Sequence, residues 1–393
     1  MKKLLSVVLA LLMLAVMLPV TAMADEANYC TIEGVEGKFD TLTAAAKAWR
    51  ESKQIVTEGS TLGGHPAELT EVESIVWNIY GTVPAGDGAG VIGTSGSILS
   101  GGYITPSITI KNVTVNGYNN AIITKTGDPY VSCGANNVAF ANITFADTMR
   151  NDSNPGSLTF TNCTFKADLR MPHAGANSTL KVENCTFTGE VSSDYAIFVQ
   201  GTMTNVVLSG NNISGYQRGV NVQADSTATV SITGNTITNL TGYTENDQTY
   251  GAAIQLTTGR EFIITNNKID VNTGNAFRFY SGLDADVTIS DNIIKAPYLV
   301  WNQAELPNEK ITSQDNKLTI TNPNKAATSD GALEDATVIK AAPTQIVIIT
   351  PTGDTPKTED QKNPSTGAND MVAAAAALMA VSALGMAVLS RKK

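Results

Sequence analysis

The stretch FTNCTF, residues 160–165, is followed one short segment later by VENCTF, residues 182–187. Both copies place apolar residues at positions one and six and a polar residue at position three. An internal repeat with a period of about 20 to 50 residues indicates a repeat architecture rather than several ordinary domains. Seven further copies, the last in a weaker form, are IKNVTV (110–115), FANITF (140–145), LSGNNI (208–213), ITGNTI (232–237), ITNNKI (264–269), ISDNII (289–294) and SQDNKL (313–318).

The third position of each copy favours a bend. It holds only Asn, Gly or Asp, the residue types that most readily adopt a left-handed backbone conformation. Because core-facing and solvent-facing residues alternate on either side of this position, each copy predicts a strand, a bend and a second strand. The predicted bend residues are Asn112, Asn142, Asn162, Asn184, Gly210, Gly234, Asn266, Asp291 and Asp315.

A third apolar segment completes each later period. Successive bends are 20 to 32 residues apart, which leaves room for three short strands per period. In this pattern the chain resembles the right-handed parallel β-helix proteins, which include pectate lyases and many bacterial surface adhesins. We therefore expect an all-β fold, a right-handed parallel β-helix over residues 72–320 built as a three-strand solenoid of about nine or ten coils. A β-sandwich of many short strands is the competing fold.

The fourth position of the repeat is expected to lie inside the solenoid. Buried asparagines are costly unless each amide bonds its neighbours in the coils above and below, so we expect a structural ladder. The alternative is that these amides bind a sugar or an ion. The column contains Asn211, Asn235, Asn267, Asn292 and Asn316.

Two cysteines hold the same position in adjacent coils. Cys163 and Cys185 should have α-carbons about 4.8 Å apart, which is within the range for a disulfide. Export would permit that bond. Buried free thiols are the simpler role and the one we favour, with the disulfide as the alternative.

The first 24 residues have the layout of a secretory signal peptide. Lys2 and Lys3 precede an apolar stretch that closes with AMA, so cleavage is expected after Ala24. An uncleaved anchor is the alternative. Residues 25–71 would then form an N-terminal cap region, with an amphipathic helix over residues 39–50 that begins at Asp40 or Thr41.

The other end of the chain combines three signals in order. The pentapeptide NPSTG, residues 363–367, precedes a charge-free apolar span, residues 371–390, and a basic tail, residues 391–393. This order resembles the cell-wall sorting signal of Gram-positive surface proteins. The resemblance implies that a sortase cleaves between Thr366 and Gly367 and transfers Thr366 to peptidoglycan. Asn363 stands before Pro364 where the family usually has Leu, which leaves the sortase class open. A plain membrane anchor is the alternative.

The chain between the two processing sites is strongly acidic. Residues 25–366 retain 21 of the 26 basic and 35 of the 36 acidic residues, which gives a net charge of −14. Nucleic acid and anionic lipid surfaces are therefore poor partners, and the membrane is expected only at the precursor's C-terminal span. Residues 321–366 contain one last apolar strand and a Pro/Thr-rich tether across the wall. The expected location is the Gram-positive cell surface.

No catalytic signature is present in the sequence. With only two histidines, a His-rich metal site is excluded, and no cofactor is expected. Calcium would suit the charge but has no motif. Lyases and glycosidases need acidic pairs, or a base beside a cation cluster, on one outward face. The charged candidates for such a site, which are more typical of a solvated surface, are Asp194, Arg218, Arg278, Asp284 and Asp286.

The outward side of the third strands is the strongest functional candidate. An alignment of these strands places Trp301 inside and Val300 outside, and amides and aromatic rings alternate on the outside. Rings stack on sugars and amides pair with hydroxyls, although a polar sheet face needs no ligand. The long loop of residues 240–250 is expected to reach over this face. The candidate glycan-binding residues are Tyr280, Arg278, Gln255, Asn221, Phe198 and Tyr243.

The sequence thus favours a wall-anchored adhesin, or a glycan-binding or structural component of the envelope. Its expected partners are sortase, peptidoglycan and host or dietary glycans. A polysaccharide lyase or glycoside hydrolase on the same fold is the alternative, with a non-enzymatic role preferred.

Overall fold

The computed structural model describes residues 28–52, 71–86, 90–94, 109–124, 131–134, 137–150, 156–174, 177–190, 194–245, 248–321, 326–327, 333–334 and 345–348. All of these residues belong to one compact unit, residues 1–350. The segments predicted to be the signal peptide, the Pro/Thr-rich tether and the sorting signal, including the apolar span at 371–390, lie outside the described residues. Among the described residues, no helix has both the length and the apolar character needed to cross a bilayer.

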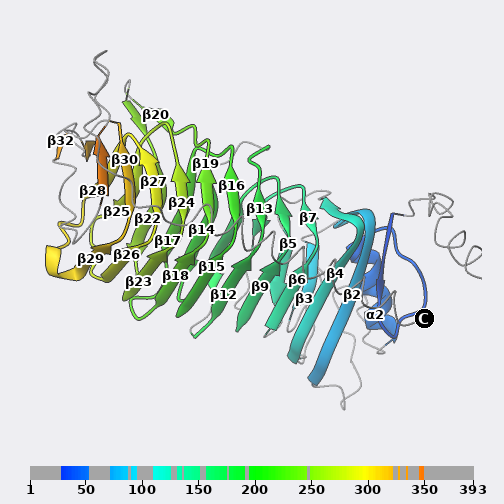
Figure 1. The fold of residues 1–393 in the computed structure, drawn as a ribbon. Coiled ribbons are helices and arrows are strands. Elements are labelled where there is room, and N and C mark those ends of the chain that lie inside the picture. Colours follow the sequence, from blue (N-terminus) through cyan, green and yellow to red (C-terminus); the bar gives the residue numbers. More distant parts are fainter. Residues whose placement is uncertain are drawn as a thin grey trace, which may run out of the picture. The chain divides into compact units, whose positions relative to one another are not determined.

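The described chain is an all-β parallel solenoid, which confirms the predicted fold class. Each coil contributes one strand to each of three sets, and each strand pairs in parallel with the corresponding strand of the next coil. Figure 1 shows the strands of each set side by side in chain order, from blue at β2 to yellow at β29. Two of the sets, together with β1 (Tyr29–Ile32), β2 (Glu71–Pro84) and β4 (Thr109–Thr124), form one 20-stranded sheet, and the third set forms a separate 7-stranded sheet.

The bounds of the strands follow the repeat. The first set is β6 (Asn137–Ala141), β9 (Ser157–Thr161), β12 (Thr179–Glu183), β15 (Asn205–Ser209), β18 (Thr229–Thr233), β23 (Glu261–Thr265), β26 (Asp286–Ser290) and β29 (Ile311–Gln314). The second set is β7 (Thr144–Phe145), β10 (Thr164–Phe165), β13 (Thr186–Phe187), β16 (Asn212–Ser214), β19 (Thr236–Thr238), β24 (Lys268–Asp270), β27 (Ile293–Ala296), β30 (Lys317–Ile320) and β33 (Gln345–Ile348). The third set is β8 (Met149–Arg150), β11 (Leu169–Ala174), β14 (Tyr195–Gly201), β17 (Arg218–Gln223), β22 (Ala252–Thr258), β25 (Asn275–Phe279) and β28 (Tyr298–Asn302).

Eight of the nine predicted bends are left-handed residues. Their φ angles lie between 54° and 67°, as at Asn162 (54°) and Gly234 (67°). The first prediction was wrong, because Asn112 lies inside a continuous strand, β4 (Thr109–Thr124), and the left-handed residues of that coil are Asn119 and Asn120. The prediction of nine or ten coils was also slightly high, since the third set has seven strands and so defines about seven turns.

The interior of the solenoid is filled by side chains stacked from coil to coil. Phe165 stacks on Phe145 at 5.0 Å and on Phe187 at 4.6 Å between ring centroids, and Phe140 stacks on Phe160 at 5.1 Å. All five rings are buried. Because identical side chains in adjacent coils are one strand spacing apart, the repeat itself produces these stacks.

The interior asparagines form a hydrogen-bonded ladder. Asn211 donates from Nδ2 to Oδ1 of Asn235 (2.8 Å), and the same bond joins Asn235 to Asn267 (3.0 Å), Asn267 to Asn292 (3.0 Å) and Asn292 to Asn316 (2.9 Å). Each Oδ1 also accepts the backbone N–H of the preceding asparagine in the column, for example at 2.9 Å between Asn235 N and Asn267. Donors and acceptors are thus satisfied together in the buried column.

The ladder continues into the cysteine column. Both Cys163 and Cys185 are buried free thiols in the structure, and the backbone N–H of Cys163 lies 3.4 Å from Sγ of Cys185. The hydrogen bond between the thiols lowers the pKa of Cys163, while that bond and burial raise the pKa of Cys185. The backbone N–H of Cys185 donates to Oδ1 of Asn211 at 2.9 Å, so amide and thiol columns are continuous.

The N-terminal end is covered by a short strand and a helix. The strand β1 (Tyr29–Ile32) pairs antiparallel with β2 (Glu71–Pro84), and α2 (Leu42–Ser52) follows it. The hydroxyl of Thr41 accepts the N–H of Ala44 at 3.0 Å and therefore caps the helix N-terminus. Burial raises the pKa of the Cys30 thiol beneath this cap to about 12.

The remaining described elements lie outside the three sets given above. These are β3 (Gly90–Thr94), β5 (Val131–Gly134), β20 (Tyr243–Glu245), β21 (Gln248–Tyr250), β31 (Ala326–Ala327), β32 (Leu333–Glu334) and the 3-10 helix η2 (Asn308–Lys310). Of these, β3 and β5 pair in parallel, whereas β20 with β21 and β31 with β32 form antiparallel pairs.

Candidate functional site

The 7-stranded sheet carries one continuous column of outward side chains. Strand register aligns each member with the next, and the members alternate along their strands with core residues such as Val220 and Phe277. We call this the outer column. It consists of Arg170, Phe198, Asn221, Gln255, Arg278 and Trp301.

The end of the outer column corrects the sequence alignment. Val300 pairs with Phe277, on the core side, and Trp301 pairs with Arg278. The sequence alignment had placed Trp301 inside and Val300 outside, which is one residue out of register. The segment LVWN is apolar on both sides of the strand, so alternation could not distinguish the two registers.

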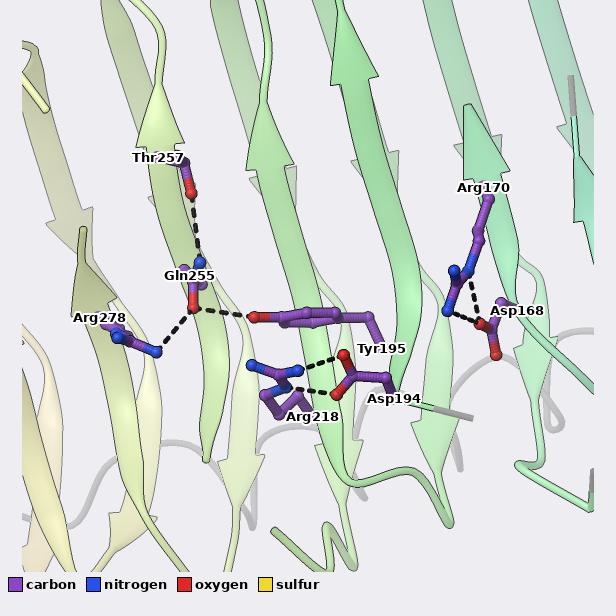
Figure 2. Close-up of polar contacts among 8 residues, drawn as sticks. All are labelled: Asp168, Arg170, Asp194, Tyr195, Arg218, Gln255, Thr257 and Arg278. Atoms are coloured by element: carbon purple, nitrogen blue, oxygen red, sulfur yellow. Dashed lines mark hydrogen bonds and ion pairs between the residues drawn. The ribbon is translucent and has the colours of Figure 1, made fainter. Parts of the chain in front are cut away.

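Gln255 is the centre of a polar network on this face. Its Oε1 accepts the hydroxyl of Tyr195 at 3.0 Å and Nη1 of Arg278 at 3.4 Å. Its Nε2 donates to Oγ1 of Thr257 at 3.3 Å, and Thr257 donates to Oδ1 of Asn221 at 2.9 Å. Figure 2 shows Gln255 as the side chain on which the Tyr195, Arg278 and Thr257 contacts converge.

Arg278 is held between two aromatic rings. Its guanidinium carbon lies 4.1 Å from the ring centroid of Trp301 and 4.9 Å from that of Tyr280. Its Nε donates to Oε1 of Gln303 at 2.8 Å. A planar guanidinium stacks well on aromatic faces, and these contacts fix its orientation.

A second arginine, two strands earlier in the same sheet on β17, is held by a carboxylate and one aromatic ring. Arg218 donates to both carboxylate oxygens of Asp194, with the Nε bond at 2.6 Å, and its guanidinium carbon lies 4.0 Å from the Tyr195 ring centroid. Tyr195 also stacks on Phe198 at 5.8 Å. Figure 2 shows Tyr195 extending across the strands, with its hydroxyl toward Gln255. Tyr195 therefore links the two arginine clusters, through its ring contact with Arg218 and its hydrogen bond to Gln255.

The predicted binding residues differ in their accessibility. Tyr280 is 40% exposed, and Phe198 and Arg278 are half-buried. Asn221 and Gln255 are each only 5% exposed, because the side chains described above cover them. These two amides therefore offer little surface to a ligand in this structure, and they bond to Arg278 and Thr257.

The backbone of Tyr243 lies near the start of β22, whereas Tyr280 follows the end of β25. Tyr243 pairs with Tyr250 in the β20–β21 hairpin, which leads directly into the first residues of β22. Tyr280 follows the end of β25, where its N–H donates to the carbonyl of Leu256. The five residues of β25, about 16 Å of extended strand, separate the two ends of the 7-stranded sheet.

Three acidic side chains among the described residues are each paired with a different basic side chain. Asp168 pairs with Arg170 at 2.7 Å, Asp194 with Arg218, and Asp284 with Lys310, whose pKa this contact raises. Guanidinium donors occupy oxygens of Asp168 and Asp194, so these oxygens are already engaged within the sheet. Asp286 begins β26, in the other sheet. Within the described ranges, no three His, Cys, Asp or Glu side chains are placed to hold a metal ion.

Four residues of this face were missed in the sequence. Tyr195, Asp168 and Gln303 lie just outside the apolar cores of their strands, where alternation does not indicate direction. Trp301 was missed through the register error. One sequence signal could have indicated Tyr195: it follows Asp194 directly and begins a third strand. In the structure Tyr195 pairs with Arg218.

Comparison with known proteins supports the fold and adds its handedness. The family model described as "Right handed beta helix region" matches residues 148–322. These residues contain the outer column and the interior ladder. Neither the curated proteins nor the solved structures yielded a match to the chain.

Proposed function

We propose that this chain, a right-handed β-helix that displays an arginine and aromatic face, is a glycan-binding surface protein anchored to a Gram-positive cell wall. The observation that carries the binding part is the Tyr280–Arg278–Trp301 cluster, with its guanidinium oriented by Gln255 and Gln303. An exposed ring beside a fixed fork of N–H donors can stack on one sugar and hydrogen-bond to its hydroxyls at the same time.

The preference for binding over catalysis rests on the carboxylates. A lyase or glycosidase on this fold would use free acidic groups facing one substrate. Here Asp168 and Asp194 are each paired with an arginine of the same sheet, and Asp284 with a lysine elsewhere. No specific contact on this face favours the enzymatic alternative, so we do not propose it.

The anchoring part of the proposal rests on the two ends of the sequence. Cleavage after Ala24 would export the chain, and the apolar span with its basic tail would hold it at the membrane until NPSTG is cleaved. Residues 25–366 would then be joined to peptidoglycan through Thr366. The acidic, Pro/Thr-rich segment before the motif would hold the solenoid away from the wall.

Anchoring is tested by changing Thr366 to Ala. The acyl-enzyme forms at the carbonyl of Thr366, so we expect Thr366→Ala to shift the protein from muramidase-released wall material to the membrane and medium fractions. Fractionation followed by immunoblotting measures the shift. Wild-type amounts of the variant in the wall fraction would exclude sortase transfer and favour a plain membrane anchor or another attachment.

Glycan binding is tested by changing Tyr280 to Ala. A glycan array probed with the purified chain identifies the ligand, and titration calorimetry then compares the variants. Loss of one stacking ring worth about 0.5–1.5 kcal/mol should weaken binding about 2- to 13-fold, while the thermal midpoint stays nearly unchanged because Tyr280 is exposed.

The matched control is Ile293→Ala, which removes another exposed apolar side chain, 54% accessible, from the other sheet. We expect it to leave affinity unchanged. Equal affinities of wild type, Tyr280→Ala and Arg278→Ala for every glycan bound would remove this face from the proposal and leave a structural spacer.

A further inference from the structure

A second aromatic cluster lies at the other end of the solenoid, outside the region matched by the family model. Tyr29, Tyr80 and Tyr118 are in register on β1, β2 and β4. Their rings are stacked, with centroids 4.6 Å apart for Tyr29 and Tyr80 and 5.1 Å apart for Tyr80 and Tyr118. Burial, and after it the neighbouring phenols of Tyr29 and Tyr118, raise the pKa of the Tyr80 hydroxyl.

The two ends of this stack differ. The ammonium group of Lys38 lies 4.2 Å from the ring centroid of Tyr29 and covers that end. At the other end Tyr118 is 44% exposed. Because its ring is within 16° of parallel to Tyr80, the face of Tyr118 away from Tyr80 points along the solenoid toward the following coil.

The following coil leaves that ring face uncovered because its bend is shorter. β4 pairs with the next coil at Asn116 and again at Ile122, which leaves five unpaired residues (117–121) between these two positions. The matching segment of the next coil, between Ala141 and Thr144, has only two residues (142–143). The extra residues, which include Asn119 and Asn120, form an exposed ledge with Tyr118. Gly117 allows the close approach, since a β-carbon there would overlap the carbonyl oxygen of Asn142.

A row of exposed amides continues from the ledge. Asn142, Asn162 and Asn184 occupy the bend of three successive coils, and all three are exposed. Nδ2 of Asn162 lies 3.5 Å from Oδ1 of Asn142, so the amides lie side by side along the stack of coils. In the next two coils the bend residue is Gly210 and then Gly234, so the row of amides ends there.

We propose that Tyr118 and the amides of Asn142, Asn162 and Asn184 form a binding strip for a neutral, extended polysaccharide that runs along the solenoid. The open ring face would stack on one pyranose, and amides one coil apart, about 4.8 Å, would pair with hydroxyls of the following sugars. The ligand is a glycan, as in the function proposed above, but the strip shares no residue with the outer column.

The chemistry of the strip selects this ligand class. All residues of the strip are uncharged, whereas residues 25–366 as a whole have a net charge of −14. The strip therefore offers no cation to an acidic polymer or a phosphate. Amides present a donor and an acceptor together, which matches a hydroxyl. The left-handed backbone at these positions is equally compatible with glycine, so the amide is not required for the bend.

The test uses the full-length chain and two neutral β-1,4-linked probes, cellohexaose and chitohexaose, measured by titration calorimetry. We expect at least one probe to bind. Tyr118→Ala should weaken that binding about 2- to 13-fold, the effect of losing one stacking ring. Tyr118→Phe should weaken it less than twofold, because stacking needs the ring and not the hydroxyl. Asn142→Gly should weaken it severalfold with little change in thermal midpoint, since glycine retains the left-handed bend.

Ile293→Ala, which removes an exposed apolar side chain that belongs to neither the strip nor the outer column, is the control and should leave binding of these probes unchanged. Tyr280→Ala reports separately whether the outer column binds the same probes. If Tyr118→Ala is unstable, Tyr118→Phe and Asn142→Gly still decide the outcome. The proposal is overturned if neither probe binds, or if binding is lost in Tyr280→Ala but kept in Asn142→Gly. Self-association that depends on Tyr118, seen by sedimentation, would instead identify a second copy as the occupant and also overturn it.

Discussion

Replacing Asn267 by leucine is expected to lower the free energy of unfolding by about 3 to 5 kcal/mol. Oδ1 of Asn267 accepts both the backbone N–H and Nδ2 of Asn235, and its Nδ2 donates to Asn292 and to the carbonyl of Ile232. Leucine is close in size but can make none of these bonds. Each buried polar group left without a partner costs about 1–3 kcal/mol.

The measurement is denaturant unfolding of purified protein, followed by circular dichroism. Asn212→Leu is the matched control, because Asn212 lies next to the ladder in sequence but is exposed. A surface substitution of this kind changes stability by about 0.5 kcal/mol or less. If both variants unfold at the same denaturant concentration, the ladder contributes nothing to stability and the column tolerates apolar side chains.

Replacing Phe165 by alanine is expected to destabilise the solenoid by about 3 to 5 kcal/mol, the usual cost of deleting a buried phenylalanine. Phe165 is fully buried, lies between the stacked rings of Phe145 and Phe187, and also meets the edge of Phe160 at 5.3 Å. The coils are fixed by backbone pairing and cannot collapse into the space left behind.

Phe198→Ala provides the comparison for this variant. Phe198 is half-buried in the outer column and packs on Tyr195 from one side. Its removal exposes existing surface rather than opening a cavity, so we expect a loss of about 1 kcal/mol. Thermal unfolding of the two variants should therefore give clearly separated midpoints. A larger effect at Phe198 than at Phe165 would contradict the assignment of inside and outside in these coils.

The sequence alone determined the features that depend on neighbouring residues. A bend that needs a left-handed residue is recognised from Asn, Gly or Asp at one position, as at Asn162 and Gly234. Alternation on either side then assigns core and surface for strands such as β18. Because each coil repeats these local requirements, the period also predicted parallel stacking and the column that holds Asn267.

Only the tertiary structure determined the features that depend on how one coil connects to and packs on the next. The register of β28 against β25 follows from the connection between them, and the apolar segment LVWN gave no alternation to fix it. The first bend was misplaced for a similar reason, since β4 continues through Asn112. Side chains that meet across coils, such as Tyr118 on Tyr80, come from positions 38 residues apart and share no local pattern.

Contacts between distant coils also explain why the accessibility of the outer column could not be predicted from the sequence. Alternation correctly indicated that Gln255 and Asn221 point away from the core, but outward is not the same as exposed. Tyr195, from two coils earlier, reaches across and bonds Gln255, and Thr257 bonds Asn221, so both amides are covered. Direction is set by the backbone of one strand and is readable from its sequence, whereas accessibility is set by long side chains of other coils and only the folded chain brings them together.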